Sequence, residues 1–420
     1  MIRTRLASTA LLLASALPLA LVAGRAEAAP PVSATTVAAA PLAASATQLA
    51  IPRPTGPYAV GRDVRHLVDE KRRDPWVPTA ERELMVSLYY PAHPDGGGES
   101  VPYMSPEEAR FFLEGRRLDG VFDAGQLAAT RTNARAGARP AGGKHPLLVL
   151  SPGFSLSRAT LTLLSEDLAS RGYVVALVDH AYESFGTAFP GGRTLTCAAC
   201  RTVESEPTDA AEKKRMGKAA QDRAADISFL VDALLRRPET GRTRFWAHSA
   251  MIDPRRVGAA GHSLGGNAAA HAMSTDDRIR AGVNLDGSFF APVPRSGLGG
   301  RPFLMLGTAA GHAPGGEDTT WPSAWRRLDG WKRWLTVKGA GHFSFLDLPV
   351  LGAQLGAGDP TVPLSGRRSG EITTSYVSAF FDRALRGAAR PLLDGPSAAD
   401  PEVAFHSPAQ YAELTLSMEP

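Results

Sequence analysis

Short, continuously apolar runs recur along the chain and are separated by segments whose apolar residues follow a helical period. Apolar runs of about four to eight residues without polar alternation are typical of strands buried on both faces of a sheet. The helical patterns cover residues 105–110, 160–169, 210–236 and 372–385. The runs that predict strands cover residues 84–90, 146–151, 173–179, 281–286, 302–307 and 334–337. Strands that alternate with helices predict an α/β fold: a mostly parallel sheet with helices on both faces.

The first 28 residues have the composition of a secretory signal peptide. Arg3 and Arg5 precede a short apolar run, and a small-x-small motif ends at Ala28. A membrane anchor is the alternative, but the run is short and Pro18 interrupts it. We therefore expect cleavage near Ala28 and a secreted, extracellular protein.

The rest of the chain reads as one folded domain with extensions. Residues 29–50 are rich in Ala, Thr, Ser and Pro and predict a flexible lead-in, since they offer few large apolar side chains. We expect the domain to span residues 51–395 and a tail to cover 396–420. The first folded element is expected near residues 58–60, a loop at 131–144, a loop-rich stretch at 183–210 and the last strand at 334–337.

Charge and cysteine content exclude several classes of function. The formal net charge is +4, but Arg3, Arg5 and Arg25 against Glu27 contribute two of these charges. The remaining basic residues are spread along the chain, so nucleic-acid binding is not expected. Cys197 and Cys200 are the two cysteines. No second pair is spaced to complete a zinc site, so we expect a disulfide in an exported protein and no metal.

Residues 257–273 carry the strongest functional signal. An apolar run leads into Gly261-His262-Ser263-Leu264-Gly265, and an Ala-rich helical segment follows. This order is typical of a nucleophile elbow, in which a serine sits on a sharp turn between a strand and a helix. Gly261 and Gly265 would let the strand and the helix pass close to Ser263. The alternative is an ordinary strand-to-helix turn.

Other chemically useful residues also follow predicted strands, which places them at one edge of a parallel sheet. His342 lies on a Gly-flanked loop after the last predicted strand and is the candidate base for Ser263. We expect the His262 side chain to point away from that base. His180 could line the pocket but is poorly placed in chain order to be the base. Residue patterns alone leave the acid open between Asp286 and Asp318.

Taken together, the motifs resemble the platelet-activating factor acetylhydrolase family of the plasma (isoform II) type. They are Pro152-Gly153-Phe154, Gly261-His262-Ser263-Leu264-Gly265-Gly266, Leu285-Asp286-Gly287, Gly341-His342-Phe343, the strand 82–87 with its Tyr90-Pro91 ending, and the helix end 167–173. The resemblance covers about residues 52–385. It implies an α/β-hydrolase fold, no cofactor or metal, and a serine esterase that removes short or oxidised acyl groups from phospholipids.

The resemblance also implies roles for individual residues. It favours Asp286 as the acid of a Ser263–Asp286–His342 triad, and the backbone N–H groups of Phe154 and Leu264 as the oxyanion hole. The family often has His-Gly before the first oxyanion residue, where this chain has Pro152-Gly153, so the shape of the pocket and the substrate can differ. The expected partner is a small-molecule or lipid ester, with transient contact to a lipid surface. Alternatives are a broader lipase, cutinase or polyester hydrolase, and an inactive hydrolase fold that only binds ligands.

Overall fold

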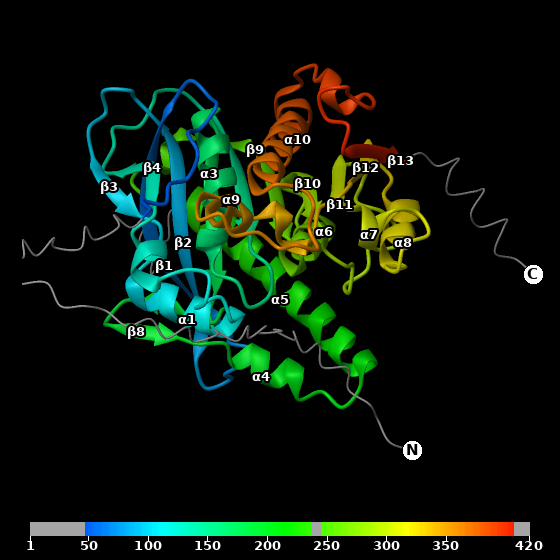
Figure 1. Cartoon of the computed structure of the whole chain (residues 1–420), viewed down its shortest axis with the longest axis horizontal. Coiled ribbons are helices and arrows are strands. Elements are labelled where there is room, and N and C mark those ends of the chain that lie inside the picture. The colour runs from blue at the N-terminus through cyan, green and yellow to red at the C-terminus, as the bar shows by residue number, and fades with distance from the viewer. Residues whose placement is uncertain (1–46, 237–244, 407–420) are drawn as a thin grey trace, which may run out of the picture. The chain divides into compact units, whose positions relative to one another are not determined.

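The structure is a computed structural model that describes residues 47–236 and 245–406. In these residues eleven strands form one sheet, in the order β13-β12-β11-β10-β9-β5-β6-β2-β1-β4-β3, and β7 and β8 form a separate pair (Figure 1). The strands are β1 (Ala59–Arg73), β2 (Glu81–Ala92), β3 (Glu99–Pro102), β4 (Arg131–Ala136), β5 (His145–Ser151), β6 (Val174–His180), β7 (Thr187–Phe189), β8 (Arg193–Leu195), β9 (Ile252–His262), β10 (Ile279–Leu285), β11 (Phe303–Thr308), β12 (Lys332–Val337) and β13 (Val403–His406).

The central strands run parallel. β6, β5, β9, β10, β11 and β12 pair in parallel, whereas β2 is antiparallel to β6 and β1. The parallel strands β5 and β6 are buried along their whole length, which explains why their sequences show no polar alternation. This arrangement confirms the mostly parallel sheet predicted from the sequence.

Two apolar layers fill the space between the sheet and its helices. On one face, α3, α9 and α10 cover the sheet (Figure 1), and their apolar side chains pack against it. On the other face, α5, α6 and α8 do so. The helices are α1 (Pro106–Arg116), α2 (Ala124–Ala128), α3 (Thr162–Ser170), α4 (Ala198–Glu204), α5 (Asp209–Leu235), α6 (Leu264–Thr275), α7 (Ala309–His312), α8 (Thr320–Arg327), α9 (Asp347–Gln354) and α10 (Gly366–Arg386).

Three predicted boundaries were wrong. Residues 131–136, expected in a loop, form β4, which pairs with β3 and β1 and is partly exposed. Residues 403–406, expected in the tail, form β13 on β12, so 334–337 is not the last strand. Leu49, expected in the lead-in, is fully buried, and Ala50 bridges to Arg131. Each error involves a short segment whose partner is distant in sequence.

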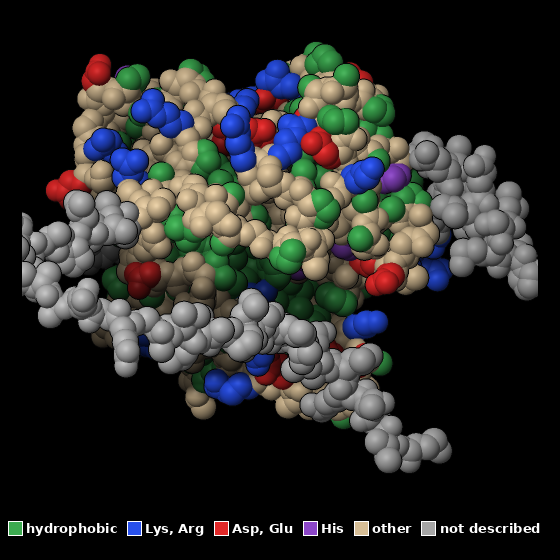
Figure 2. All heavy atoms as spheres, viewed as in Figure 1, with side chains coloured by type: hydrophobic (Ala, Val, Ile, Leu, Met, Phe, Trp, Pro, Cys, Tyr) green, Lys and Arg blue, Asp and Glu red, His purple; other side chains and the backbone are tan. Residues whose placement is uncertain are grey.

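The predicted signal peptide, residues 1–28, lies outside the described residues. Among the residues that are described, no helix combines the length and apolar character needed to span a membrane. On the face shown in Figure 2, Lys and Arg side chains are scattered among Asp and Glu side chains rather than gathered in one stripe.

Candidate active site

Ser263 occupies a strained turn between β9 and α6. Its φ of 54° and ψ of −123° lie outside the regions that non-glycine residues ordinarily adopt, which is a feature of functional turns. Its backbone N–H donates to the carbonyl of Leu285 at 2.8 Å. A Cβ atom on Gly265 would lie 2.0 Å from the Ser151 carbonyl oxygen, and one on Gly261 would lie 2.3 Å from the Gly265 carbonyl carbon. The predicted strand, tight turn and helix are therefore present, and both glycines are required by close packing.

Asp286 and His342 meet at the same edge of the sheet. Asp286 follows β10 with a φ of 56°, and its Oδ2 accepts a 2.7 Å hydrogen bond from His342 Nδ1. Burial raises the pKa of Asp286, but hydrogen bonds from His312 and His342 outweigh burial and lower this pKa well below its usual range. The Asp286 carboxylate is thus ionised and fixes the tautomer of His342, whose side chain is 42% exposed.

Asp318 reaches the same carboxylate indirectly, through a histidine that the sequence reasoning missed. His312 Nδ1 lies 2.8 Å from Asp286 Oδ1, and its Nε2 lies 3.1 Å from Asp318 Oδ2. A neutral imidazole has one N–H, so a ring that faces a carboxylate oxygen at both nitrogens is cationic. Burial lowers the pKa of His312, but the two carboxylates raise it to about 9. The sequence signal was available, because His312 also lies just after a predicted strand.

His262 does not point away from the candidate base, as the sequence analysis expected. The ring centroids of His262 and His342 are 4.5 Å apart, and His262 Nε2 donates to the backbone carbonyl of His342 at 2.8 Å. Burial and the nearby His342 lower the pKa of His262 to about 3, so the ring is neutral. The prediction failed because the turn His342–Phe345 packs over the end of β9, and the sequence does not show this contact.

His180 does not line a pocket. Its side chain is fully buried and contacts Asp226 Oδ2 at 2.6 Å through Nδ1 and Ser151 Oγ at 3.0 Å through Nε2. It belongs to what we call the Arg82 cluster, a buried group of ionisable side chains below the loop that follows β5. The members of the Arg82 cluster are Asp74, Arg82, His180, Glu183, Arg223 and Asp226.

The candidate oxyanion hole lies between that loop and the start of α6. Phe154 follows β5 through Pro152-Gly153, and Arg223 Nη1 donates to the Pro152 carbonyl at 2.6 Å. Leu264 is the first residue of α6, where backbone N–H groups have no acceptor within the helix. Neither the Phe154 N–H nor the Leu264 N–H donates a hydrogen bond to any group in the described part of the chain. Trp76, Met216 and Phe290 pack around these two residues and make the surroundings apolar.

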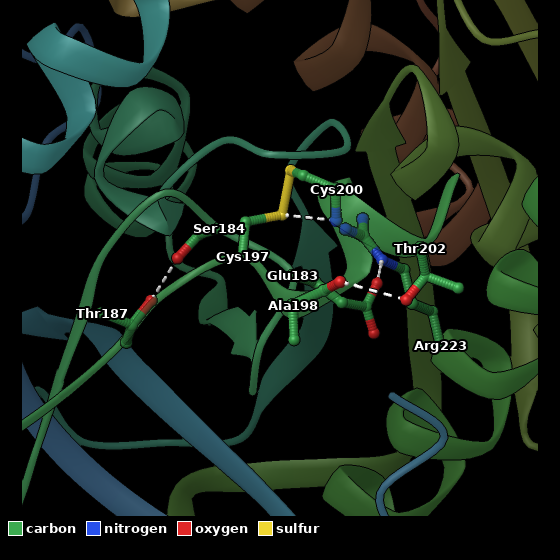
Figure 3. Close-up of a disulfide and its surroundings, with 8 residues drawn as sticks. All are labelled: Glu183, Ser184, Thr187, Cys197, Ala198, Cys200, Thr202 and Arg223. Atoms are coloured by element: carbon green, nitrogen blue, oxygen red, sulfur yellow. Dashed lines mark hydrogen bonds and ion pairs between the residues drawn. A yellow bond between two sulfur atoms is a disulfide. The ribbon is translucent and has the colours of Figure 1, made fainter. Parts of the chain in front are cut away.

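The predicted disulfide between Cys197 and Cys200 is present, with the two Cα atoms 5.2 Å apart (Figure 3). Cys197 caps α4, and its sulfur accepts from the Cys200 N–H at 3.1 Å. Both cysteines are buried, and Phe154, Trp76 and Phe185 pack against them. The disulfide therefore supports the apolar side of the candidate oxyanion loop.

In residues 47–236 and 245–406, no group of three or more His, Cys, Asp or Glu side chains is arranged to hold a metal.

Comparison with known proteins assigns the family. The family model described as platelet-activating factor acetylhydrolase, isoform II, matches residues 43–208 and 244–357. A probable 1-alkyl-2-acetylglycerophosphocholine esterase from Arthroderma benhamiae is 29% identical over 388 residues, which cover 84% of this chain and 93% of that protein. A platelet-activating factor acetylhydrolase from Gallus gallus is 25% identical over 350 residues, 73% of this chain and 76% of that protein.

A solved structure extends the comparison to three dimensions. A ferulic acid esterase from Streptomyces cinnamoneus superimposes with a TM-score of 0.72 at 40% identity, covering 86% of this chain and 100% of that one. All of these proteins are esterases or acetylhydrolases by name, and the sheet order agrees with an α/β-hydrolase fold. The chain belongs to the platelet-activating factor acetylhydrolase, isoform II, family and is a carboxylic ester hydrolase.

Proposed function

We propose that the protein is a secreted serine esterase in which Ser263 is the nucleophile, His342 the general base and Asp286 the group that orients the base. The observation that carries this proposal is the 2.7 Å hydrogen bond from His342 Nδ1 to Asp286 Oδ2, next to a serine held at positive φ. With Nδ1 occupied as a donor, the neutral imidazole has its lone pair on Nε2, where it can accept the serine proton.

The reaction then follows from these positions. His342 takes the Ser263 proton while Oγ attacks the ester carbonyl, and the Phe154 and Leu264 N–H groups stabilise the oxyanion. The protonated His342 gives its proton to the leaving alcohol, and an acyl-enzyme remains. Water, deprotonated by His342, then attacks the acyl-enzyme; the carboxylic acid is released, and His342 returns the proton to Ser263 Oγ. In the described residues Ser263 Oγ has no hydrogen-bond partner, as is common before substrate binds.

The proposed substrates are phospholipid esters with an acetyl or other short acyl group. The family assignment and the name of the Arthroderma benhamiae relative support this class. A second candidate is an ester of an aromatic acid, because the 40% identical structural relative is described as a ferulic acid esterase. The apolar side chains around Phe154 and Leu264 include Trp76 and Phe290, which suit a flat aromatic acyl group.

Two experiments test the proposal. Ser263→Ala should lower kcat by roughly a millionfold, the scale of loss when a triad nucleophile is removed, and should abolish labelling by a fluorophosphonate probe. Near-native hydrolysis by this variant would refute the nucleophile assignment. A panel of esters from acetyl to long-chain acyl, with a feruloyl ester included, ranks the substrate classes. Rates that rise steadily with acyl length would favour the lipase or cutinase alternative, and chelators should not change any of them.

A further inference from the structure

Arg116 lies at the rim of the candidate active site. It belongs to the last turn of α1, and its guanidinium carbon sits 4.3 Å from the centroid of the Phe343 ring. Phe343 follows the candidate base, and its ring centroid is 5.3 Å from that of His342. The positive charge of Arg116 also contributes to the lowered pKa of His262, which places it within electrostatic reach of the buried ring beneath His342.

Arg116 differs from the buried arginines of this protein because no acidic group is bound to it. Arg82 contacts three carboxylates, and Arg158 contacts Asp179 and Glu108. Arg116 is partly buried, and in the described residues no carboxylate or carbonyl oxygen accepts its N–H groups. Burial lowers its pKa, and no neighbouring anion offsets that effect. A partly desolvated cation without a partner is unfavourable, so binding of an anion there would stabilise it.

The geometry of the guanidinium defines what it can bind. The guanidinium lies over the Phe343 ring, which covers one side of the group and leaves N–H groups on its other sides for hydrogen bonding. A planar fork of N–H donors matches two oxygens of a phosphate better than it matches a single carbonyl. In a glycerophospholipid, only a short chain of bonds separates the phosphodiester from an ester at the central carbon. One molecule can therefore place the ester at Ser263 and the phosphate near the rim.

We propose that Arg116, held over the Phe343 ring, binds the phosphodiester group of the substrate and so selects phosphate-bearing esters over neutral esters with the same acyl group. This inference rests on the proposed function, since it assigns a residue to the alcohol part of a phospholipid ester. Arg116 acts on substrate binding and not on the proton transfers, so its contribution is expected in KM rather than in kcat.

The test compares matched variants on matched substrates. The substrates are 1-alkyl-2-acetylglycerophosphocholine and 1-alkyl-2-acetylglycerol, which differ in the phosphocholine group. Arg116→Gln should raise KM for the phosphate-bearing ester roughly tenfold with little change in kcat, the usual scale for loss of a charge-assisted hydrogen bond. For the neutral ester, kcat/KM should stay within about twofold. Arg116→Lys should recover part of the loss.

Arg110→Gln is the matched control. Arg110 lies on the same helix and stacks on a phenylalanine, Phe111, with 4.1 Å from its guanidinium carbon to the ring centroid, but it is bonded to Glu114. This variant should leave both substrates unchanged. If Arg116→Gln lowered kcat/KM equally for both esters, the anion subsite would be wrong and Arg116 would be a support for the His342 turn.

A second readout separates the subsite from the proposed substrate. Glycerophosphocholine, which carries the phosphodiester but no ester, should competitively inhibit hydrolysis of a neutral acetyl ester, and Arg116→Gln should weaken that inhibition. If the acetyl phospholipid proved not to be a substrate but this Arg116-dependent inhibition remained, the subsite would stand and the proposed substrate would fail. Inhibition that did not change in Arg116→Gln would overturn the subsite.

Discussion

The molecule contains two clusters of ionisable side chains around the candidate site, and they differ in how their charges balance. The Arg82 cluster is closed: its side chains are all at most 1% exposed. The second group, which we call the Asp286 cluster, consists of Asp286, His312, Asp318 and His342. It is buried at Asp286 but open at the other end, where the His342 side chain is 42% exposed.

The charges of the Arg82 cluster are paired before any substrate arrives. Its carboxylates contact Arg82, Arg223 and the adjoining Arg72, while burial lowers the pKa of His180 and favours its neutral form. The Asp286 cluster has two carboxylates against one cation, His312, and lacks one positive charge while His342 is neutral. Protonation of His342 supplies that charge. The Arg82 cluster therefore suits a structural role, and the Asp286 cluster suits the stabilisation of the imidazolium that the proposed mechanism forms at His342.

Within these two clusters, the largest expected effect comes from exchanging the acid of the Asp286 cluster. Asp286→Asn should favour the wrong His342 tautomer and lower kcat by about four orders of magnitude. Asp318→Asn should be far milder, within about tenfold, because His312 separates Asp318 from His342. Initial rates of the two purified variants decide between them. A large loss in Asp318→Asn with a mild one in Asp286→Asn would reverse the assignment of the acid.

The matching change in the Arg82 cluster should act on stability and not on chemistry. Asp226→Asn removes a buried partner of both Arg82 and His180, and breaking a buried ion pair typically costs about 3–5 kcal/mol. We expect that loss in the free energy of unfolding, measured with denaturant. Rates per active site, counted by titration with a fluorophosphonate, should remain near those of the original protein. A millionfold loss of kcat in folded protein would contradict the division between the two clusters.

This comparison also shows what the sequence could predict. The buried strands were found within about two residues, as at 146–151 for β5 and 302–307 for β11, because a strand covered on both faces has no polar alternation to obscure it. The strand β4 and the edge strand β13 were missed, since each is short, partly exposed and paired with a segment distant in sequence.

The site shows the same limit. The rule that functional residues follow parallel strands placed Ser263, Asp286 and His342 at one edge, and the structure brings the last two into contact. The rule could not choose between Asp286 and Asp318, because both residues follow predicted strands. In the structure both carboxylates contact His312, and Asp286 alone of the two also contacts His342. The position of His262 under His342 likewise depends on a turn packing across 80 residues of sequence.

The charge of His312 can be tested through the pH dependence of stability. Its pKa is raised to about 9 in the folded protein, so its contribution to stability should be complete below the unfolded value near 6.5 and lost as pH rises through 9. His312→Gln should therefore destabilise the protein by about 3 kcal/mol near pH 6 and by much less near pH 10. Denaturant unfolding at the two pH values measures this difference, and equal losses at both would contradict a cationic His312.

The same variant should change the acid limb of the activity profile. Removing the His312 cation leaves the negative charges of Asp286 and Asp318 unbalanced, which favours the protonated imidazole at the candidate base. The acid limb of the pH profile of kcat/KM should then move to higher pH. Asp318→Asn removes a negative charge instead and should move the limb to lower pH. Shifts in the same direction would show that the two residues act through packing and not through charge.

The smallest expected effect lies where the Arg82 cluster meets the disulfide, beside Glu183 and Arg223 (Figure 3). The loop closed by Cys197 and Cys200 is very short, so the chain-entropy contribution of the bond should be at most about 2 kcal/mol. The double variant Cys197→Ser/Cys200→Ser should unfold at slightly lower denaturant and retain most of its kcat, because Phe154 also packs against the apolar cluster that contains Leu264. Intact mass should rise by two hydrogens on reduction of the original protein. Two thiols that react with an alkylating agent before reduction would show that the cysteines do not pair in the native protein.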